Sequence, residues 1–419
     1  MLYRPHLNAQ LQARREEFVR FEAVWNESVG EYARRLRQLG GRTSAEIKGA
    51  AERAIAAGAA RAPGALPADE LERAGAFVIP FGERWRSHQE ARRWALEMLT
   101  ERMTCAADGS QILPGREISL PVAAVQAAWF ENPHTEGGQD TYRKESRFSI
   151  ITPEELLEAE GGAATAADLV GLRRFELELG ALSEFLERRR GWRARGERMP
   201  LAFFDGTLLL STTRTRTDTL SAMLDFSRGY VKAIVEAVRL SRDTQVPLVG
   251  YIDQSYARDL VRLLDLLSTD ARPAATVFDA RLLSVAADGG DKEPLFAAWG
   301  DRTIFCYCVR EGMKEFQDKE GNPLIGFLYL QTTGESAPAR LDIPAWVYEA
   351  GLIDEVVNTV RAECVVGNGY PYALETADAA AVITMQDREQ FLRAMQEFAA
   401  EQNLGFHVSR KPVSKAHRR

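Results

Sequence analysis

Two short segments of this chain end in an aspartate that follows a strand-like run and precedes a glycine and a hydroxyl residue. The first is CAADGS at residues 105–110, and the second is LAFFDGT at residues 201–207. One Asp-Gly pair alone is typical of an ordinary turn. Two of them, with glutamates on a helix in between, predict carboxylates gathered around divalent metal ions. Such ions suit phosphodiester cleavage, because they activate a water molecule and stabilise the leaving oxygen.

Length and composition place the chain among globular proteins. Its 419 residues can bury a large core in one elaborated domain or two, and 45% are hydrophobic and 27% charged. No run approaches the roughly 18 to 20 apolar residues that span a bilayer, and residues 1–15 are charged rather than signal-like. We therefore expect a cytoplasmic protein without membrane association.

Cysteine usage and charge are less informative. Four cysteines are too few for a disulfide framework, and Cys306 and Cys308 fall on one side of a predicted strand, which favours small core residues over a zinc site. The net charge of -7 does not indicate nucleic-acid binding, although an acidic protein can contain a basic channel. Arg188, Arg189 and Arg190 are candidate phosphate contacts, and a solvated helix face is the alternative.

Hydrophobic periodicity divides the chain into a helical start and a mixed α/β remainder. Apolar residues recur at helical spacing from 7 to 39, and an alanine-rich helix is expected over 47–60, so residues 1–97 are predicted to form a helical extension for dimerisation or partner docking. Strands are expected at 104–107, 122–130 and 148–151, followed by a helix with an apolar face from 169 to 186 and a strand at 201–205 continuing through 210.

This order of strand, strand, strand, helix and strand predicts an α/β fold of the ribonuclease H-like type, with a mixed sheet and flanking helices. Acidic residues stand on the first strand, the helix and the fourth strand, which are the three places where that fold assembles its metal site. Further along, we expect helices at 217–242, 260–267, 345–363, 376–385 and 387–401, a strand at 247–252 and a hairpin from strands 303–309 and 324–331.

Several dispersed motifs resemble the NurA family of DNA-repair nucleases. The most specific are ADGSQI at 107–112, FDGTL at 204–208 and GYPYALETAD at 369–378, and the resemblance extends over 104–384. It implies a NurA-type nuclease domain at 98–419 that cuts single- and double-stranded DNA from 5′ ends and single strands internally, with Mn²⁺ or Mg²⁺ as cofactor. It also implies a homodimer and a hexameric DNA-translocating ATPase of the HerA type as partner in the resection of double-strand breaks.

The resemblance also assigns roles to particular residues. Asp108 and Asp205 match metal-binding aspartates of the family, and Asp378 falls where many members carry a histidine, which puts metal preference and any proton-shuttle role in doubt. For the helix glutamate, periodicity does not separate Glu176 from Glu178, and the resemblance favours Glu176. The four acids Asp108, Glu176, Asp205 and Asp378 are predicted to hold two ions.

Tyr370 matches a family tyrosine that could contact substrate, and packing beside Pro371 is its structural alternative. Two other functional classes remain open at this point. One is a catalytically weak dimeric adaptor that regulates the ATPase, with Asp378 marking the loss of activity. The other is a strand-transfer enzyme, which is disfavoured because the sequence shows no separate DNA-recognition module.

Overall fold

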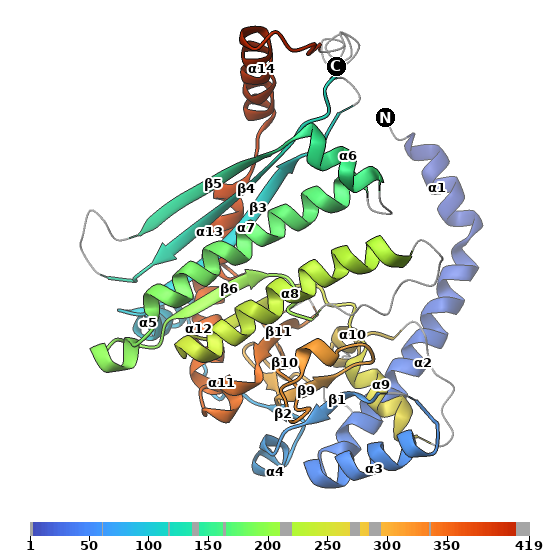
Figure 1. Cartoon of the computed structure of the whole chain (residues 1–419). Helices are drawn as coiled ribbons and strands as arrows, with labels where there is room; N and C mark the ends of the chain where they lie inside the picture. Colours follow the sequence, from blue (N-terminus) through green and yellow to red (C-terminus); the bar gives the residue numbers. More distant parts are fainter. Residues whose placement is uncertain are drawn as a thin grey trace. The chain divides into compact units, whose positions relative to one another are not determined.

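The computed structural model describes residues 3–60, 62–115, 118–135, 142–161, 165–209, 220–268, 277–284, 295–334 and 337–407. The chain divides into two compact units. Figure 1 labels the helices and strands of both and colours them along the sequence. The first comprises Met1–Arg84, Ile252–Glu311 and Gly326–Leu341, and the second comprises Trp85–Tyr251, Gly312–Ile325 and Asp342–Arg419. The predicted domain boundary between residues 97 and 98 does not coincide with the limits of these units, because the N-terminal segment clusters with two later segments.

The second unit is built on a mixed sheet. Its strands are β3 (Thr104–Ile112), β4 (Ala123–Asn132), β5 (Arg143–Ile151), β6 (Leu201–Asp205) and β7 (Leu248–Ile252), in the order β5-β4-β3-β6-β7. The first three strands pair antiparallel, whereas β6 is parallel to both β3 and β7. The chain reaches β6 from β5 through helices, as predicted. This arrangement confirms the α/β class with a ribonuclease H-like core.

Helix α7 (Ala166–Arg189) and helix α13 (Tyr372–Ala381) cover opposite faces of this sheet. On β4, Phe130 and Gln126 contact α13, whereas Glu131 contacts α7. Because alternate side chains of a strand point to opposite faces, the two helices lie on different sides. Thr165 and Asp168 form a capping box at the start of α7, and its apolar side is buried, as the leucine spacing predicts.

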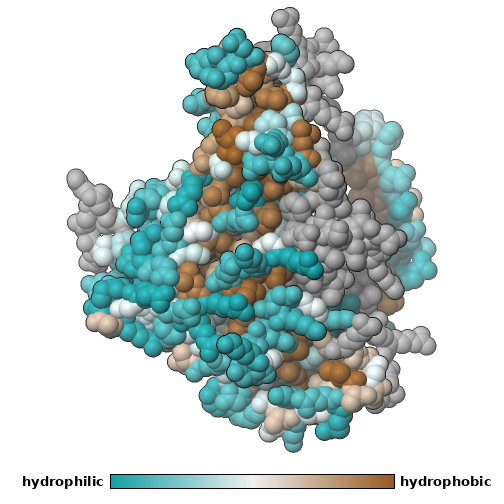
Figure 2. Space-filling view, viewed as in Figure 1, coloured by the Kyte–Doolittle hydropathy of each residue, from teal (hydrophilic) through white to brown (hydrophobic). Residues whose placement is uncertain are grey.

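The remaining helices of the second unit surround the sheet. They are α5 (His88–Leu99), α6 (Pro153–Gly161), α8 (Leu220–Thr244), α11 (Ala345–Glu349), α12 (Ile353–Val366) and α14 (Met385–Glu401), with the 3-10 turns Trp192–Arg195 and Lys314–Phe316. The helix predicted over 345–363 is interrupted, because Gly351 adopts a left-handed φ of 70° between α11 and α12. Residue 210 and residues 217–219, which the sequence places in a strand and a helix, lie outside the described residues. Hydrophobic residues are exposed on α14, among them Met385 and Phe398, and Figure 2 shows hydrophobic patches on this helix.

The first unit combines helices with short strands. The helices are α1 (Arg4–Ala13), α2 (Arg15–Leu39), α3 (Ser44–Ala56), α4 (Glu70–Ala74), α9 (Asp259–Leu266) and α10 (Asp279–Leu283). The strands are β1 (Gly64–Pro67), β2 (Val78–Ile79), β8 (Arg302–Thr303), β9 (Cys306–Val309), β10 (Ile325–Leu330) and the start of β11 (Ala339–Pro344). β9 and β10 pair antiparallel, which confirms the predicted hairpin. The segment predicted as purely helical also contains β1 and β2, which pair with β9 and β8.

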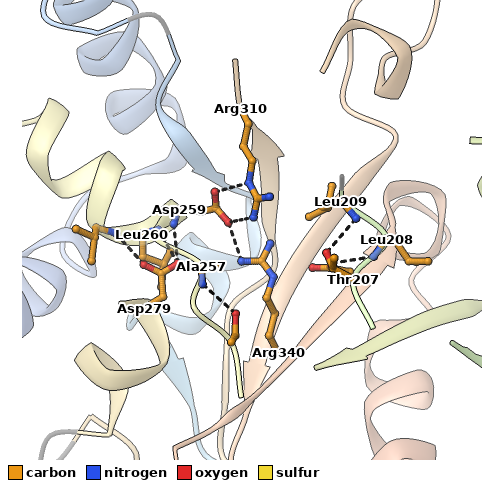
Figure 3. A network of polar contacts seen from close by, with 12 residues as sticks. Thr207, Leu208, Leu209, Ala257, Asp259, Leu260, Asp279, Arg310 and Arg340 are labelled. Carbon is orange, nitrogen blue, oxygen red and sulfur yellow. Dashed lines mark hydrogen bonds and ion pairs between the residues drawn. The ribbon is translucent and has the colours of Figure 1, made fainter. Parts of the chain in front are cut away.

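A buried ionic network occupies the core of the first unit (Figure 3). The carboxylate of Asp259 accepts hydrogen bonds from Arg310, at 2.7 and 2.6 Å, and from Arg340, at 2.7 Å. Asp279 accepts from the backbone N–H groups of residues 259, 260 and 261 at the start of α9. An isolated buried charge is costly. These charged side chains can be buried in the core because they pair with one another.

All four cysteines are buried, which confirms the prediction of Cys306 and Cys308 as core residues. Within the described parts of the chain, no helix combines the length and the apolar character needed to cross a membrane.

Candidate active site

The register of two parallel strands places Asp108 beside Asp205. Strand β3 pairs with β6 so that Ala107 lies opposite Phe204, and the two aspartates are the next residues on each strand. Neighbouring strands are about 4.8 Å apart, so the two side chains emerge close together. The Asp-Gly pair predicts a strand that ends at Asp108, but β3 does not end there. It continues to Ile112, because its antiparallel pairing with β4 extends as far as Ala124.

The loop after β6 holds Asp205 at the end of its strand. Gly206 has a φ of 133°, and Asp342 accepts hydrogen bonds from the Thr207 hydroxyl at 2.6 Å and the Leu208 N–H at 3.1 Å (Figure 3). Gly250 on β7 lies against this loop, where a Cβ would come within 2.6 Å of the Gly206 carbonyl oxygen. Asp205 itself is exposed, although the other four residues of β6 are buried.

The carboxyl group of Asp108 lies among two other acids. Its pKa is raised to about 6, chiefly by burial and also by the nearby carboxylates of Asp205 and Asp378, against the lowering effect of the Gly109 N–H. Asp378 comes from α13, more than 150 residues further along the chain than Asp205. The structure therefore brings three of the four predicted acids together from three separate segments.

The fourth acid of this cluster is Glu178, not Glu176. The pKa of Glu178 is raised to about 7, because burial and the carboxylates of Asp108 and Asp205 raise it by more than the Arg174 guanidinium lowers it. Glu176 is exposed and pairs with Arg173, whose Nη1 is 3.1 Å from its Oε2. Two residues correspond to a rotation of about 200° on a helix, so the two glutamates face opposite ways. The structure does not bring Glu176 to the other acids.

Gly109 and Arg174 shape the side of the cluster that faces α7. A Cβ on Gly109 would clash with Glu178 Oε1, so the absence of a side chain allows α7 to approach β3 here. Arg174 donates from Nη1 to the Gly109 carbonyl oxygen at 3.2 Å, and its Nε is 3.4 Å from Glu178 Oε1. Sequence reasoning missed Arg174. Its only signal is the four-residue spacing to Glu178, which is common among surface pairs.

A cavity of about 460 Å³ opens on the opposite side of the sheet from α7. It is lined by Asp205, Gly367, Tyr370, Glu375 and Asp378. Tyr370, the predicted substrate contact, packs edge-to-face on Tyr251 with the ring centroids 5.1 Å apart. Glu375 precedes Asp378 by one turn of α13 and was not assigned from the sequence. The cavity is therefore polar and mostly acidic.

The three arginines predicted to contact phosphate lie at the far end of α7. Arg188 pairs with Glu131, Arg190 with Glu187, and the Arg189 guanidinium lies 5.8 Å from the centroid of the Phe185 ring. At about 1.5 Å per residue, Arg188 is about 15 Å along the helix from Glu178. The structure does not bring these arginines to the acidic cluster.

The donor set of this cluster fits hard divalent cations, which bind carboxylate oxygens. Oε1 of Glu178 is buried without a hydrogen-bond partner, as expected of a group whose partner is a cation. In the conformation described, no three acidic, histidine or cysteine side chains of the described residues are close enough to coordinate one ion.

Comparison with known proteins gives one family match. The model of the NurA domain matches residues 102–383. No curated protein matches the chain. Among solved structures, the C-terminal lobe of a budding yeast Argonaute is similar with a TM-score of 0.27 and 11% sequence identity. That match covers 74% of this chain and 52% of the Argonaute chain, so this protein spans about half of its length.

Proposed function

The chain belongs to the NurA family, and from that premise we propose that it is a metal-dependent DNA nuclease. One observation carries the proposal. Asp108, Glu178, Asp205 and Asp378 come from four separate elements. The carboxylates of Asp205 and Asp378 raise the pKa of Asp108, and those of Asp108 and Asp205 raise the pKa of Glu178. Folded proteins avoid gathering like charges, because each raises the cost of ionising the others. A cluster of this kind is therefore maintained for a ligand of opposite charge.

Asp108, Glu178, Asp205 and Asp378 would hold two Mn²⁺ or Mg²⁺ ions, with Glu178 in place of the predicted Glu176. Bound ions of this kind lower the pKa of an attacking water and stabilise the departing oxygen. The protein's own contribution is to position the reactants. Tyr370 forms one wall of the cavity beside Asp205 and Asp378, where its ring and hydroxyl can hold a nucleotide.

The finer activities rest on the family resemblance. We propose 5′-to-3′ digestion of single- and double-stranded DNA and internal cutting of single strands, in the resection of double-strand breaks. A homodimer and a hexameric translocase of the HerA type are the proposed partners.

A catalytically weak adaptor that regulates such a translocase is the second candidate. The observation that favours it is Asp378, which stands where many members of the family carry a histidine. This change removes an imidazole, whose ordinary pKa lies near neutral pH without any shift from its surroundings. An aspartate is nevertheless an oxygen ligand for Mg²⁺ or Mn²⁺, so the nuclease is the stronger candidate.

Turnover on end-labelled single-stranded DNA separates the two. The wild-type protein should release nucleotides with Mn²⁺ and none after chelation, and Asp205→Asn should lose activity by at least about 100-fold. Asp205 is exposed, so this substitution should leave the melting temperature nearly unchanged. A wild-type protein that stays inactive with Mn²⁺ and with its translocase would favour the adaptor instead.

A further inference from the structure

A group of aromatic side chains with one lysine lies beside the candidate active site on the face of the sheet that α13 covers. Tyr142 stands just before β5, Lys144 lies on β5 opposite Phe130 of β4, and Tyr372 is the first residue of α13. Phe130 and Lys144 occupy paired positions, so their side chains emerge on the same face. We call Tyr142, Lys144 and Tyr372 the tyrosine–lysine surface.

The three members are arranged around the buried ring of Phe130. Its centroid is 5.7 Å from that of Tyr142 and 5.9 Å from that of Tyr372. Lys144 Nζ lies 5.6 Å from the centroids of both Phe130 and Tyr142, within the range of a cation–π contact. Tyr142 is 60% exposed and Tyr372 38% exposed, whereas Phe130 is only 2% exposed. A buried ring thus supports two exposed rings and a cation.

The surface continues into the candidate active site along α13. Tyr372, Glu375 and Asp378 follow one another at three-residue steps and are all exposed, and the last two line the cavity. At about 1.5 Å per residue, Tyr372 is about 9 Å along the helix from Asp378. That distance equals about three nucleotides of a stacked strand at 3.4 Å each.

We propose that the tyrosine–lysine surface binds the bases of single-stranded DNA and leads the strand to the acidic cluster. This inference rests on the proposed function and adds a substrate contact to it. Exposed rings supply stacking faces that accept any base, and a lysine among them supplies the charge that phosphates require. Duplex DNA does not offer its base faces, so the surface distinguishes single strands from double strands.

A protein partner is the competing occupant, because β5 is the last strand of the sheet order and an exposed edge can pair with another chain. The nature of the group favours DNA. Exposed rings beside a positive charge are typical of single-strand binding, whereas lysine is depleted at protein interfaces.

The experiment measures the affinity of full-length protein for a fluorescent oligothymidine by anisotropy, with chelator present to prevent cleavage. The variants are Tyr142→Ala with Tyr372→Ala, Lys144→Gln, and Tyr142→Phe with Tyr372→Phe. Phe148→Ala is the matched control, because Phe148 is a 48% exposed aromatic residue on the same face of β5 that packs on Phe391 of α14 instead. Light scattering and thermal melting accompany each variant.

We expect the double alanine variant to bind at least about tenfold more weakly, since each stacked base is worth about 1–3 kcal/mol. Lys144→Gln should weaken binding less, and the double phenylalanine variant and Phe148→Ala should bind like the wild type. The inference is overturned if the double alanine variant binds as tightly as Phe148→Ala, or if the double substitution dissociates a dimer.

A second measurement does not depend on the variants being folded. An oligonucleotide with 5-iodouracil, photocrosslinked to wild-type protein, should label the peptides that contain Tyr142 or Tyr372, and labelling confined to other peptides contradicts the inference. A wild-type protein that does not bind the oligothymidine contradicts the proposed function as well. Normal wild-type binding with unaffected variants contradicts only the tyrosine–lysine surface.

Discussion

Glu176 and Glu178 are two residues apart on α7 and face opposite ways, so they form a matched pair of substitutions. Glu178→Gln should lower turnover by at least about 100-fold, because loss of a group that merely supports a metal ligand can cost that much. Glu176→Gln should keep turnover within about twofold, since exposed ion pairs contribute little. The test is Mn²⁺-dependent digestion of labelled single-stranded DNA. Equal loss in both variants would show that neither glutamate has a specific role.

Arg173 and Arg174 offer a second matched pair. Arg174 is the cation beside Glu178, whereas Arg173 pairs with exposed Glu176 and Glu155. Because Arg174 neutralises a carboxylate that a metal would need, Arg174→Gln should tighten Mn²⁺ binding. Its side chain is 39% exposed, so the gain should be about 1 kcal/mol at most, or about fivefold in affinity. Arg173→Gln should leave the affinity unchanged.

Titration of Mn²⁺ followed by electron paramagnetic resonance measures both variants without turnover. Weaker binding in Arg174→Gln would mean that the arginine organises the carboxylates rather than competing for them.

The sequence predicts much of the cluster because the acids at its centre sit in conspicuous local patterns. Asp108 and Asp205 follow strand-like runs, and the parallel pairing of those strands accounts for their proximity. Glu176 and Glu178 both border the apolar face of α7, so periodicity does not reveal which one faces β3. Glu178 lies against Gly109, where a Cβ would clash with its Oε1. Such a contact between distant segments leaves no local signal.

At the scale of elements, predictions succeed for long periodic helices. They fail for strands whose existence or length depends on pairing with another strand. Helices α2 and α7 carry apolar residues at regular spacing, and both form. Strand β3 is longer than predicted, because Gly109, Ser110 and Gln111 give no strand signal and are kept in the sheet by pairing with β4. Strands β1 and β2 are only four and two residues long, and each pairs with a strand more than 200 residues away.

Helix α13 gives a prediction at this scale, because one buried carboxylate holds its first turn. Glu363 on α12 accepts hydrogen bonds from the Ala373 N–H at 2.9 Å and the Thr104 hydroxyl at 3.0 Å, and lies 3.4 Å from His134 Nε2. Glu363→Gln keeps the shape but replaces one acceptor oxygen with a donor. We expect a loss of about 1–3 kcal/mol in stability and lower turnover, since α13 carries Asp378.

Urea unfolding and nuclease assays of the same preparation check this expectation, with the exposed Glu349→Gln on α11 as control. Unchanged stability in Glu363→Gln would mean that the start of α13 is held by other contacts.

At the scale of the whole molecule, the family match covers residues 102–383 and so includes parts of both compact units. The chain passes between the units several times, because the first unit is assembled from three separate segments. Local patterns do not show this, since each segment has ordinary helix and strand periodicity.

The binding partners of the protein are a separate question. A homodimer and a hexameric translocase remain predictions, to be checked by light scattering and by copurification.

The ionic network of the first unit gives the last prediction. Burial by itself would raise the pKa of Asp259, but Arg340 and Arg310 outweigh it and lower the pKa to about 2. An acid with a lowered folded-state pKa stabilises the protein above its unfolded pKa of about 4, and that contribution is lost as the pH falls toward 2. Asp259→Asn removes the charge and leaves two buried arginines without it, so we expect a loss of about 3–5 kcal/mol at pH 7.

Because the wild-type protein loses the same charge in acid, the difference between wild type and Asp259→Asn should shrink between about pH 4 and pH 2. Urea unfolding at pH 7, 4 and 3 measures this difference, and Glu52→Gln, an exposed carboxylate on α3 of the same unit, is the control. A difference that stays constant over this range would mean that Asp259 stabilises the unit through its shape and hydrogen bonds, which asparagine partly keeps, rather than through its charge. A difference that closes would identify the network as an acid-sensitive part of the core. Its loss would come at a lower pH than protonation of the acidic cluster, since the pKa values of Asp108 and Glu178 are about 6 and 7 and that of Asp259 is about 2.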